Sequence, residues 1–245
     1  MNLLDGLPLA LQVGIPVGVF LLLCLLVPMG VVYAQVQKMR QGVYLRRLDE
    51  QAAAAVYRRV REEADWAQAQ GFVVFEEIYT FELGVAAILA VWRHAEHPSY
   101  LVLFLAGKKR QLILVTEFSQ HLDLTTGATT DLQLCPQPPG HYVQTFRGLS
   151  PTGLLDRHLA AARYITGTGG VRIEPVRGGF EDAFTRGERA QAAYVQTLPA
   201  WPLRAPYWFY VRKRLRHNKS IERLHKAGKL LLPNSPGYAP FTFAE

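Results

Sequence analysis

The chain has 245 residues, of which 49% are hydrophobic and 19% charged, a balance typical of folded proteins rather than disordered ones. Its formal net charge of +7 is compatible with contact to anionic lipid, an acidic protein or nucleic acid. The two cysteines, Cys24 and Cys135, exclude a disulfide framework and a zinc-binding spacing. Length and composition therefore predict one folded domain, with or without helical appendages.

An apolar segment occupies residues 7–34, with Gln12 as its strongly polar side chain. As a helix, residues 9–33 extend about 37 Å, enough to cross a hydrocarbon core about 30 Å thick. Val32-Tyr33-Ala34 resembles a signal-peptide cleavage site. However, no Lys or Arg precedes the segment, and it is about twice the usual length of the apolar part of a signal peptide. We therefore predict a retained transmembrane anchor over residues 1–34.

The distribution of basic residues predicts the orientation of this anchor. None precedes the apolar segment, whereas Lys38, Arg40, Arg46 and Arg47 follow it closely. The positive-inside rule then places the N-terminus outside and the rest of the chain in the cytoplasm. The excess of arginine over lysine is common in chains from GC-rich bacteria. The prediction is a single-pass protein of the cell membrane, in a bacterium the inner membrane.

Residues 35–70 are predicted to form a juxtamembrane helix. Leu45, Leu48, Ala52, Val56 and Val60 lie three or four residues apart, which places them on one side of a helix. Two interpretations follow: a dimerising coiled-coil stalk, or an amphipathic helix packed on its own domain. The apolar stripe is short and rich in alanine, which favours the second interpretation.

From Gly71 onward the hydrophobic pattern becomes that of β-strands. Apolar or alternating runs cover residues 72–83, 85–93, 99–106 and 111–118, and turn-forming residues separate them. The segment 125–130, flanked almost symmetrically by leucines, indicates a further hairpin, and 141–146 a last strand. Because the connections are short, we predict an antiparallel meander.

Helices are expected again after this sheet. Ser150 and Pro151 form a typical helix start. A short edge strand is expected at 171–176 and another helix at 181–198. The predicted fold class is α+β: a single N-terminal transmembrane helix, a juxtamembrane helix, and an antiparallel sheet packed with C-terminal helices, with 71–203 as the soluble domain.

A basic and aromatic segment, 204–245, follows that domain. Nine basic residues and one acidic residue lie from Arg204 to Lys229. Four consecutive aromatics at 207–210 directly precede most of these basic residues. Such a segment suits the headgroup region of a bilayer, where aromatic rings and cations are both favoured. Three alternatives stay open: anionic lipid headgroups, an acidic or membrane-embedded protein partner, or a solvated surface; nucleic acid is the least favoured partner. The candidate membrane- or partner-binding residues are Trp208, Phe209, Arg212, Lys213, Arg214, Arg216 and Lys219.

No motif with diagnostic catalytic or metal-binding spacing is present. The densest group of potential acid–base or ligand residues is His94, His97, Glu117, His121 and Asp123. Turn residues exposed to solvent explain this group better than a metal site does. Cys135 and His141 form a nucleophile–base pair by composition alone. The sequence therefore predicts neither a metal nor a cofactor.

The expected function is non-catalytic: a membrane-anchored interaction or scaffolding protein on the cytoplasmic side, for example an accessory subunit of a larger membrane complex. The alternative is a membrane-tethered enzyme with a site around His94, His97 and His121. The two functions differ in one structural consequence. An enzyme requires these histidines to converge on a pocket with Glu117 or Asp123, whereas an interaction protein leaves them scattered over turns.

Overall fold

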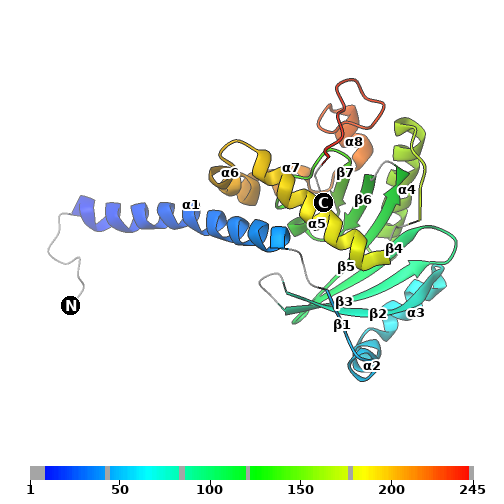
Figure 1. Ribbon diagram of the computed structural model, residues 1–245. Coiled ribbons are helices and arrows are strands. Elements are labelled where there is room, and N and C mark those ends of the chain that lie inside the picture. The colour runs from blue at the N-terminus through cyan, green and yellow to red at the C-terminus, as the bar shows by residue number, and fades with distance from the viewer. Residues whose placement is uncertain (1–8, 42–44, 83–85, 120–121, 176–178, 243–245) are drawn as a thin grey trace.

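The computed structural model describes residues 9–41, 45–82, 86–119, 122–175 and 179–242, and shows a long N-terminal helix projecting from an α+β domain (Figure 1). The sheet lies at the centre of the domain, with helices on both of its faces. This confirms the predicted class, with an N-terminal apolar helix, a central sheet and C-terminal helices.

Helix α1 (Leu9–Gln41) is a single uninterrupted helix of 33 residues. Among the described residues it is the one helix long and apolar enough to cross a membrane. Most of its apolar side chains from Val13 to Val31 are exposed, whereas Val32, Val36 and Met39 are completely buried against the domain. The C-terminal end of α1 is therefore part of the folded core.

The predicted continuous helix over 35–70 is wrong, because the chain leaves α1 after Gln41 and forms three separate elements. Strand β1 (Arg46–Arg47) pairs with the edge of the sheet, and helices α2 (Glu50–Arg59) and α3 (Arg61–Ala69) follow. The side chain of Asp49 accepts a hydrogen bond from the backbone N–H of Ala52, at 2.8 Å, and so starts a new helix. The apolar side of α2 and α3 packs on the sheet, as expected for an amphipathic helix rather than a stalk.

Seven strands form one sheet, in chain order from β1 to β7. Strands β2 to β6 form the expected antiparallel meander, because each connection between them is short. Strand β1 also pairs antiparallel with β2, although α2 and α3 lie between these two strands in the chain. After β1 they are β2 (Phe72–Glu82), β3 (Ala86–His94), β4 (Ser99–Ala106), β5 (Lys109–Phe118), β6 (Leu122–Gly127) and β7 (His141–Thr145).

The last strand corrects the sequence prediction, because β7 is parallel to β6 and the sheet is mixed rather than antiparallel. The hairpin expected around 125–130 does not form. Instead, the chain leaves β6 through a 3-10 turn, η2 (Thr130–Gln133), and a proline-rich segment. This connection returns the chain to the beginning of β6, so β7 starts beside Asp123 and runs in the same direction.

The helices after the sheet begin with α4 (Pro151–Gly169), whose first turn is capped by Ser150 as predicted; Ser150 accepts a hydrogen bond from Gly153 N–H at 3.1 Å. The strand expected at 171–176 is reduced, over its described part, to one bridge between Ile173 and Phe118. The remaining elements are α5 (Gly179–Thr197), α6 (Trp201–Tyr207), the π-helical η3 (Trp208–Arg212), α7 (Lys213–Arg216) and α8 (Ile221–Lys226).

The central strands are apolar on both sides because both faces of the sheet are covered. Trp92 and Leu101 face α2, α3 and α4, whereas Leu89 and Val102 face Phe180 of α5 on the opposite side. This arrangement explains why the strands are nearly continuous apolar runs in the sequence. It also places α5 over the sheet face that carries the candidate site.

His158 of α4 connects the helix to the sheet through a buried polar network. Its two ring nitrogens lie 2.8 Å from the hydroxyl of Thr116 and 2.9 Å from that of Thr126. His158 is completely buried, and the resulting desolvation lowers its pKa to about 3. The ring is therefore neutral at physiological pH and has a structural role.

Candidate functional site: a pocket between the sheet and α5

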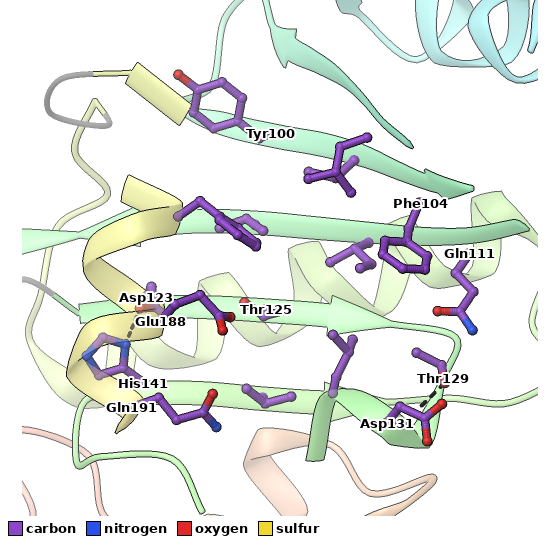
Figure 2. Close-up of a pocket in the computed structure, with 18 of the residues that line it drawn as sticks. Tyr100, Phe104, Gln111, Asp123, Thr125, Thr129, Asp131, His141, Glu188 and Gln191 are labelled. Atoms are coloured by element: carbon purple, nitrogen blue, oxygen red, sulfur yellow. Dashed lines mark hydrogen bonds and ion pairs between the residues drawn. The ribbon is translucent and has the colours of Figure 1, made fainter. Parts of the chain in front are cut away.

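A cavity of about 720 Å³ lies between α5 and the face formed by β4, β5, β6 and β7. Figure 2 shows the two ends of this pocket. Asp123, His141, Glu188 and Gln191 lie together at one end, and Phe104, Gln111, Thr129 and Asp131 lie at the other. A volume of this size suits a small organic molecule.

Three charged side chains are brought together by the register of the sheet. Glu117 of β5 is directly opposite Asp123 of β6, and Asp123 is beside His141 at the start of β7. Side chains at such paired positions point to the same face of the sheet. Residues that are 24 positions apart in the chain therefore form one continuous row across three strands.

This row is electrically balanced. The carboxylates of Glu117 and Asp123 would repel each other at opposed positions, but each has a cationic partner. His141 Nδ1 forms an ion pair with Asp123, and Arg186 Nη2 of α5 lies 3.6 Å from Glu117 Oε1. Burial alone would lower the pKa of His141, but the negative charges of Asp123 and Glu117 outweigh this effect and raise it.

Glu188 differs from the other acidic groups of the pocket. It lies on the sheet-facing side of α5, four residues after Phe184 and three before Gln191. Loss of hydration raises the pKa of its carboxyl to about 7. No hydrogen bond or ion pair in the described part of the chain involves Glu188. The pocket therefore contains a carboxyl group that only a ligand or water can satisfy.

The walls of the pocket between its polar groups are mainly apolar. Strands β4 and β5 contribute Val102, Phe104 and Val115, and α5 contributes Phe180 and Phe184. Apolar walls with a few convergent polar groups are the usual composition of a small-molecule site. The arrangement suits a ligand with an apolar body and a cationic or hydrogen-bond-donating group placed next to Glu188.

Cys135 also lines the pocket, but its environment does not activate it as a nucleophile. Burial and, to a smaller extent, the nearby Glu188 raise the pKa of the thiol to about 12, so it stays protonated at neutral pH. His141, its hypothetical base, is held by Asp123. Cys135 and His141 therefore do not form an activated nucleophile–base pair.

Two of the histidines singled out in the sequence, His94 and His97, lie away from this pocket. His94 and His97 stack on each other at the end of β3, with ring centroids 4.7 Å apart, and neither lines the pocket. His121 lies outside the described residues. Glu117 and Asp123 do line the pocket, with His141 as their neighbouring histidine. Sequence reasoning missed this grouping because it depends on the parallel pairing of β6 and β7.

The basic aromatic segment is largely engaged in contacts within the domain. Trp208 is buried against α1 and α5. Arg212 Nη1 donates hydrogen bonds to the carbonyl oxygens of Gln133 and Cys135, at 3.0 and 3.1 Å. These contacts hold the connection between β6 and β7, which forms one wall of the pocket.

Lys213 and Arg216 of this segment also have partners within the domain. The Lys213 ammonium lies 4.3 Å from the centre of the Phe209 ring and 3.7 Å from Asp131 Oδ1. Arg216 donates to the carbonyl oxygen of Lys229 at 3.3 Å. Arg214 is exposed and Lys219 half-buried.

No cluster of three or more potential metal ligands occurs in the part of the chain that the structure describes. The site is therefore defined by its apolar walls, its balanced row of charges and the carboxyl of Glu188. Comparisons with protein-family models, with curated proteins and with solved structures give no match to this chain.

Proposed function

We propose that this protein is a membrane-anchored domain that binds a small ligand with an apolar body and a basic group in the pocket beneath α5. The observation that carries the proposal is the carboxyl of Glu188, placed in the pocket without a hydrogen-bond or ion-pair partner among the described residues. A protonated amine would supply the missing charge, and the aromatic walls would bury the apolar part of the same molecule.

The packing of α1 supports the anchor. The helix continues through the candidate cleavage site at 32–34, and buried side chains lie on both sides of it: Val32 before, Val36 and Met39 after. Cleavage would remove part of a core that also contains α5 and α6. Retention of α1 as a membrane anchor is therefore favoured over a cleaved signal peptide.

The position of the pocket relative to α1 supports a site near the bilayer. Gln35, which lies just after the apolar segment, is one of the residues that line the pocket. In an anchored protein, a ligand with an apolar body would reach the pocket from the membrane surface. The basic residues after the apolar segment support a cytoplasmic location of the domain. A reporter that is active only outside the cytoplasm, fused to Glu245, should therefore give no signal.

Ligand binding can be tested on the full chain in lipid nanodiscs by calorimetry. The probes are three naphthalene derivatives of similar size: naphthylethylamine, naphthaleneethanol and naphthylacetate, each corrected with empty discs. We expect the amine to bind best, and more tightly at pH 8 than at pH 6, because Glu188 ionises across this range.

Glu188→Gln should weaken binding of the amine more than binding of the other two probes. Glu181→Gln, at an exposed position of the same helix, should leave binding of the amine unchanged. Binding of none of the three probes, or a preference for the carboxylate, would contradict the proposal.

A second candidate is the accessory subunit of a membrane complex. Gly14 and Gly18 are four residues apart on α1, and apart from the local backbone of α1 nothing lies within 4 Å of where their Cβ would be, so a partner helix could approach closely there. In this case the Gly14→Leu and Gly18→Leu double variant should lose proteins that co-purify with the chain in mild detergent. The Val17→Leu variant serves as control. Unchanged co-purification in the double variant would count against a partner at this face.

A further inference from the structure

Helices α6, η3 and α7 form one continuous helical segment over residues 201–216 with an exposed apolar side. Leu203, Tyr207, Val211 and Leu215 follow one another at intervals of four residues and are between 41% and 66% exposed. A π-helix has more residues per turn than an α-helix, so the π-turn at η3 keeps residues with this spacing on one side. We call these four side chains the apolar stripe.

The opposite side of the same segment is packed against α1. Ala205 and Trp208 are buried in a cluster with Val32 and Val36, and the rings of Trp201 and Tyr33 stack with centroids 5.7 Å apart. Figure 1 shows α6 alongside α1. The segment is therefore attached to the helix that forms the proposed anchor.

The contact reaches into the apolar part of α1. Tyr210 lies beside Cys24, which is near the middle of the apolar segment 7–34. Cys24 precedes Tyr33 by nine residues, which corresponds to about 13 Å along a helix. The part of 201–216 that includes Tyr210 is therefore at the level of the apolar surface of α1 rather than beyond its end.

We propose that the segment 201–216 is embedded in the bilayer leaflet that α1 crosses, with the apolar stripe in contact with lipid acyl chains. The stripe and α1 together expose many large apolar side chains, which soluble proteins rarely do. Arg204, exposed near the end of the segment that contacts Tyr33, can extend to the headgroups. This inference depends on the anchor of the proposed function but not on its ligand pocket.

The chemistry of this contact differs from that expected from charge alone. Arg212 and Lys213 were predicted from the sequence to contact headgroups, but both side chains interact with other residues of the domain. The contact is therefore mainly apolar and should depend little on salt or on anionic lipid.

Quenching of a fluorophore at single cysteines tests the proposal in nanodiscs that contain one full-length chain each. In a background with Cys24→Ala and Cys135→Ala, NBD is attached at Leu203→Cys or Val211→Cys. Leu149→Cys, at an exposed position before α4, is the soluble control, and Val19→Cys, exposed on α1, is the membrane reference. Near-ultraviolet circular dichroism verifies that each labelled variant is folded.

We expect lipid-attached doxyl groups to quench the label at Leu203 and Val211 several-fold more than at Leu149, and aqueous iodide to quench it less. Quenching at both positions like that at Leu149, with Val19 still quenched by doxyl, would overturn this inference and leave the anchor intact. Absence of doxyl quenching at Val19 would overturn the anchor as well. Protection of Leu203 and Val211 from both quenchers in these one-chain discs would show that protein rather than lipid covers the stripe, and would also overturn the proposal.

Discussion

Replacing Glu188 by Gln should stabilise the protein at neutral and alkaline pH while it weakens binding of a basic ligand. The carboxyl has a pKa of about 7 in the folded protein, compared with 4.5 for an unperturbed group. Since a tenfold change in proton affinity corresponds to about 1.4 kcal/mol, ionised Glu188 costs the folded state up to about 3 kcal/mol. Because the side chain faces a pocket that can hold water, this figure is an upper bound.

The sign of the pH dependence follows from the raised pKa. As pH increases, the unfolded carboxyl ionises first, so the stability of the native protein decreases between about pH 4.5 and 7 and stays reduced above that range. Gln has no such titration. The stabilisation by Glu188→Gln should therefore be small at pH 4.5 and largest at pH 8.

Thermal unfolding of the full chain in mild detergent, followed by circular dichroism, measures this difference. For a chain of this size, about 3 kcal/mol corresponds to an increase in Tm of roughly 6 to 12 °C at pH 8. Glu181→Gln, at an exposed position of the same helix, should leave the Tm unchanged at both pH values. An equal effect of Glu188→Gln at pH 4.5 and pH 8 would refute the argument that burial of the charged form is the cause.

Three further changes test the packing. His158→Gln should lower the free energy of unfolding at pH 7, because a buried hydrogen bond is lost. Between pH 7 and pH 5 the stability of the wild type should decrease by about 2 kcal/mol more than that of the variant. The reason is that the folded protein, in which the pKa of His158 is about 3, does not take up the proton that the unfolded chain binds. A parallel pH dependence in both proteins would contradict this. Arg212→Met should lower the free energy of unfolding, measured by chemical denaturation, by about 2 to 3 kcal/mol, because two carbonyl oxygens lose a charged donor. Arg214→Met should change it very little. Equal effects of the two substitutions would exclude the structural role of Arg212. Val36→Ala should cost about 2 kcal/mol and Val19→Ala almost nothing, because Val36 is buried in the domain core and Val19 is exposed. Equal stability of the two variants would contradict the packing of the C-terminal end of α1 in the core.

The local features of the fold could be predicted from the sequence because they depend on neighbouring residues. The apolar segment that forms α1 contains enough consecutive apolar residues to define a long helix. The short turns between the strands from β2 to β6 leave antiparallel pairing as the arrangement that the chain can reach. Ser150 and Pro151 started a helix as expected because capping is a contact across three residues.

The grouping of the site residues was decided by the tertiary structure. Glu117, Asp123 and His141 form a row because β7 returns beside β6 in parallel, and the direction of that return depends on the packing of the whole connection at 128–140. The predicted helix over 35–70 is likewise interrupted because residues 46–47 pair with β2, after which Asp49 caps the start of α2. Such pairings join distant segments, so no local pattern records them.

The environments of single side chains show most clearly what the sequence determines and what the tertiary structure adds. The sequence shows that residues 204–229 are rich in basic side chains and contain an aromatic cluster. It does not show that Trp208 is buried or that Arg212 donates hydrogen bonds to two carbonyl oxygens. It shows an acidic residue at position 188, but not the cavity that raises the pKa of this carboxyl. Residue type and order determine which charges and apolar surfaces are available. Which of them lose water depends on the neighbours that only the folded chain provides.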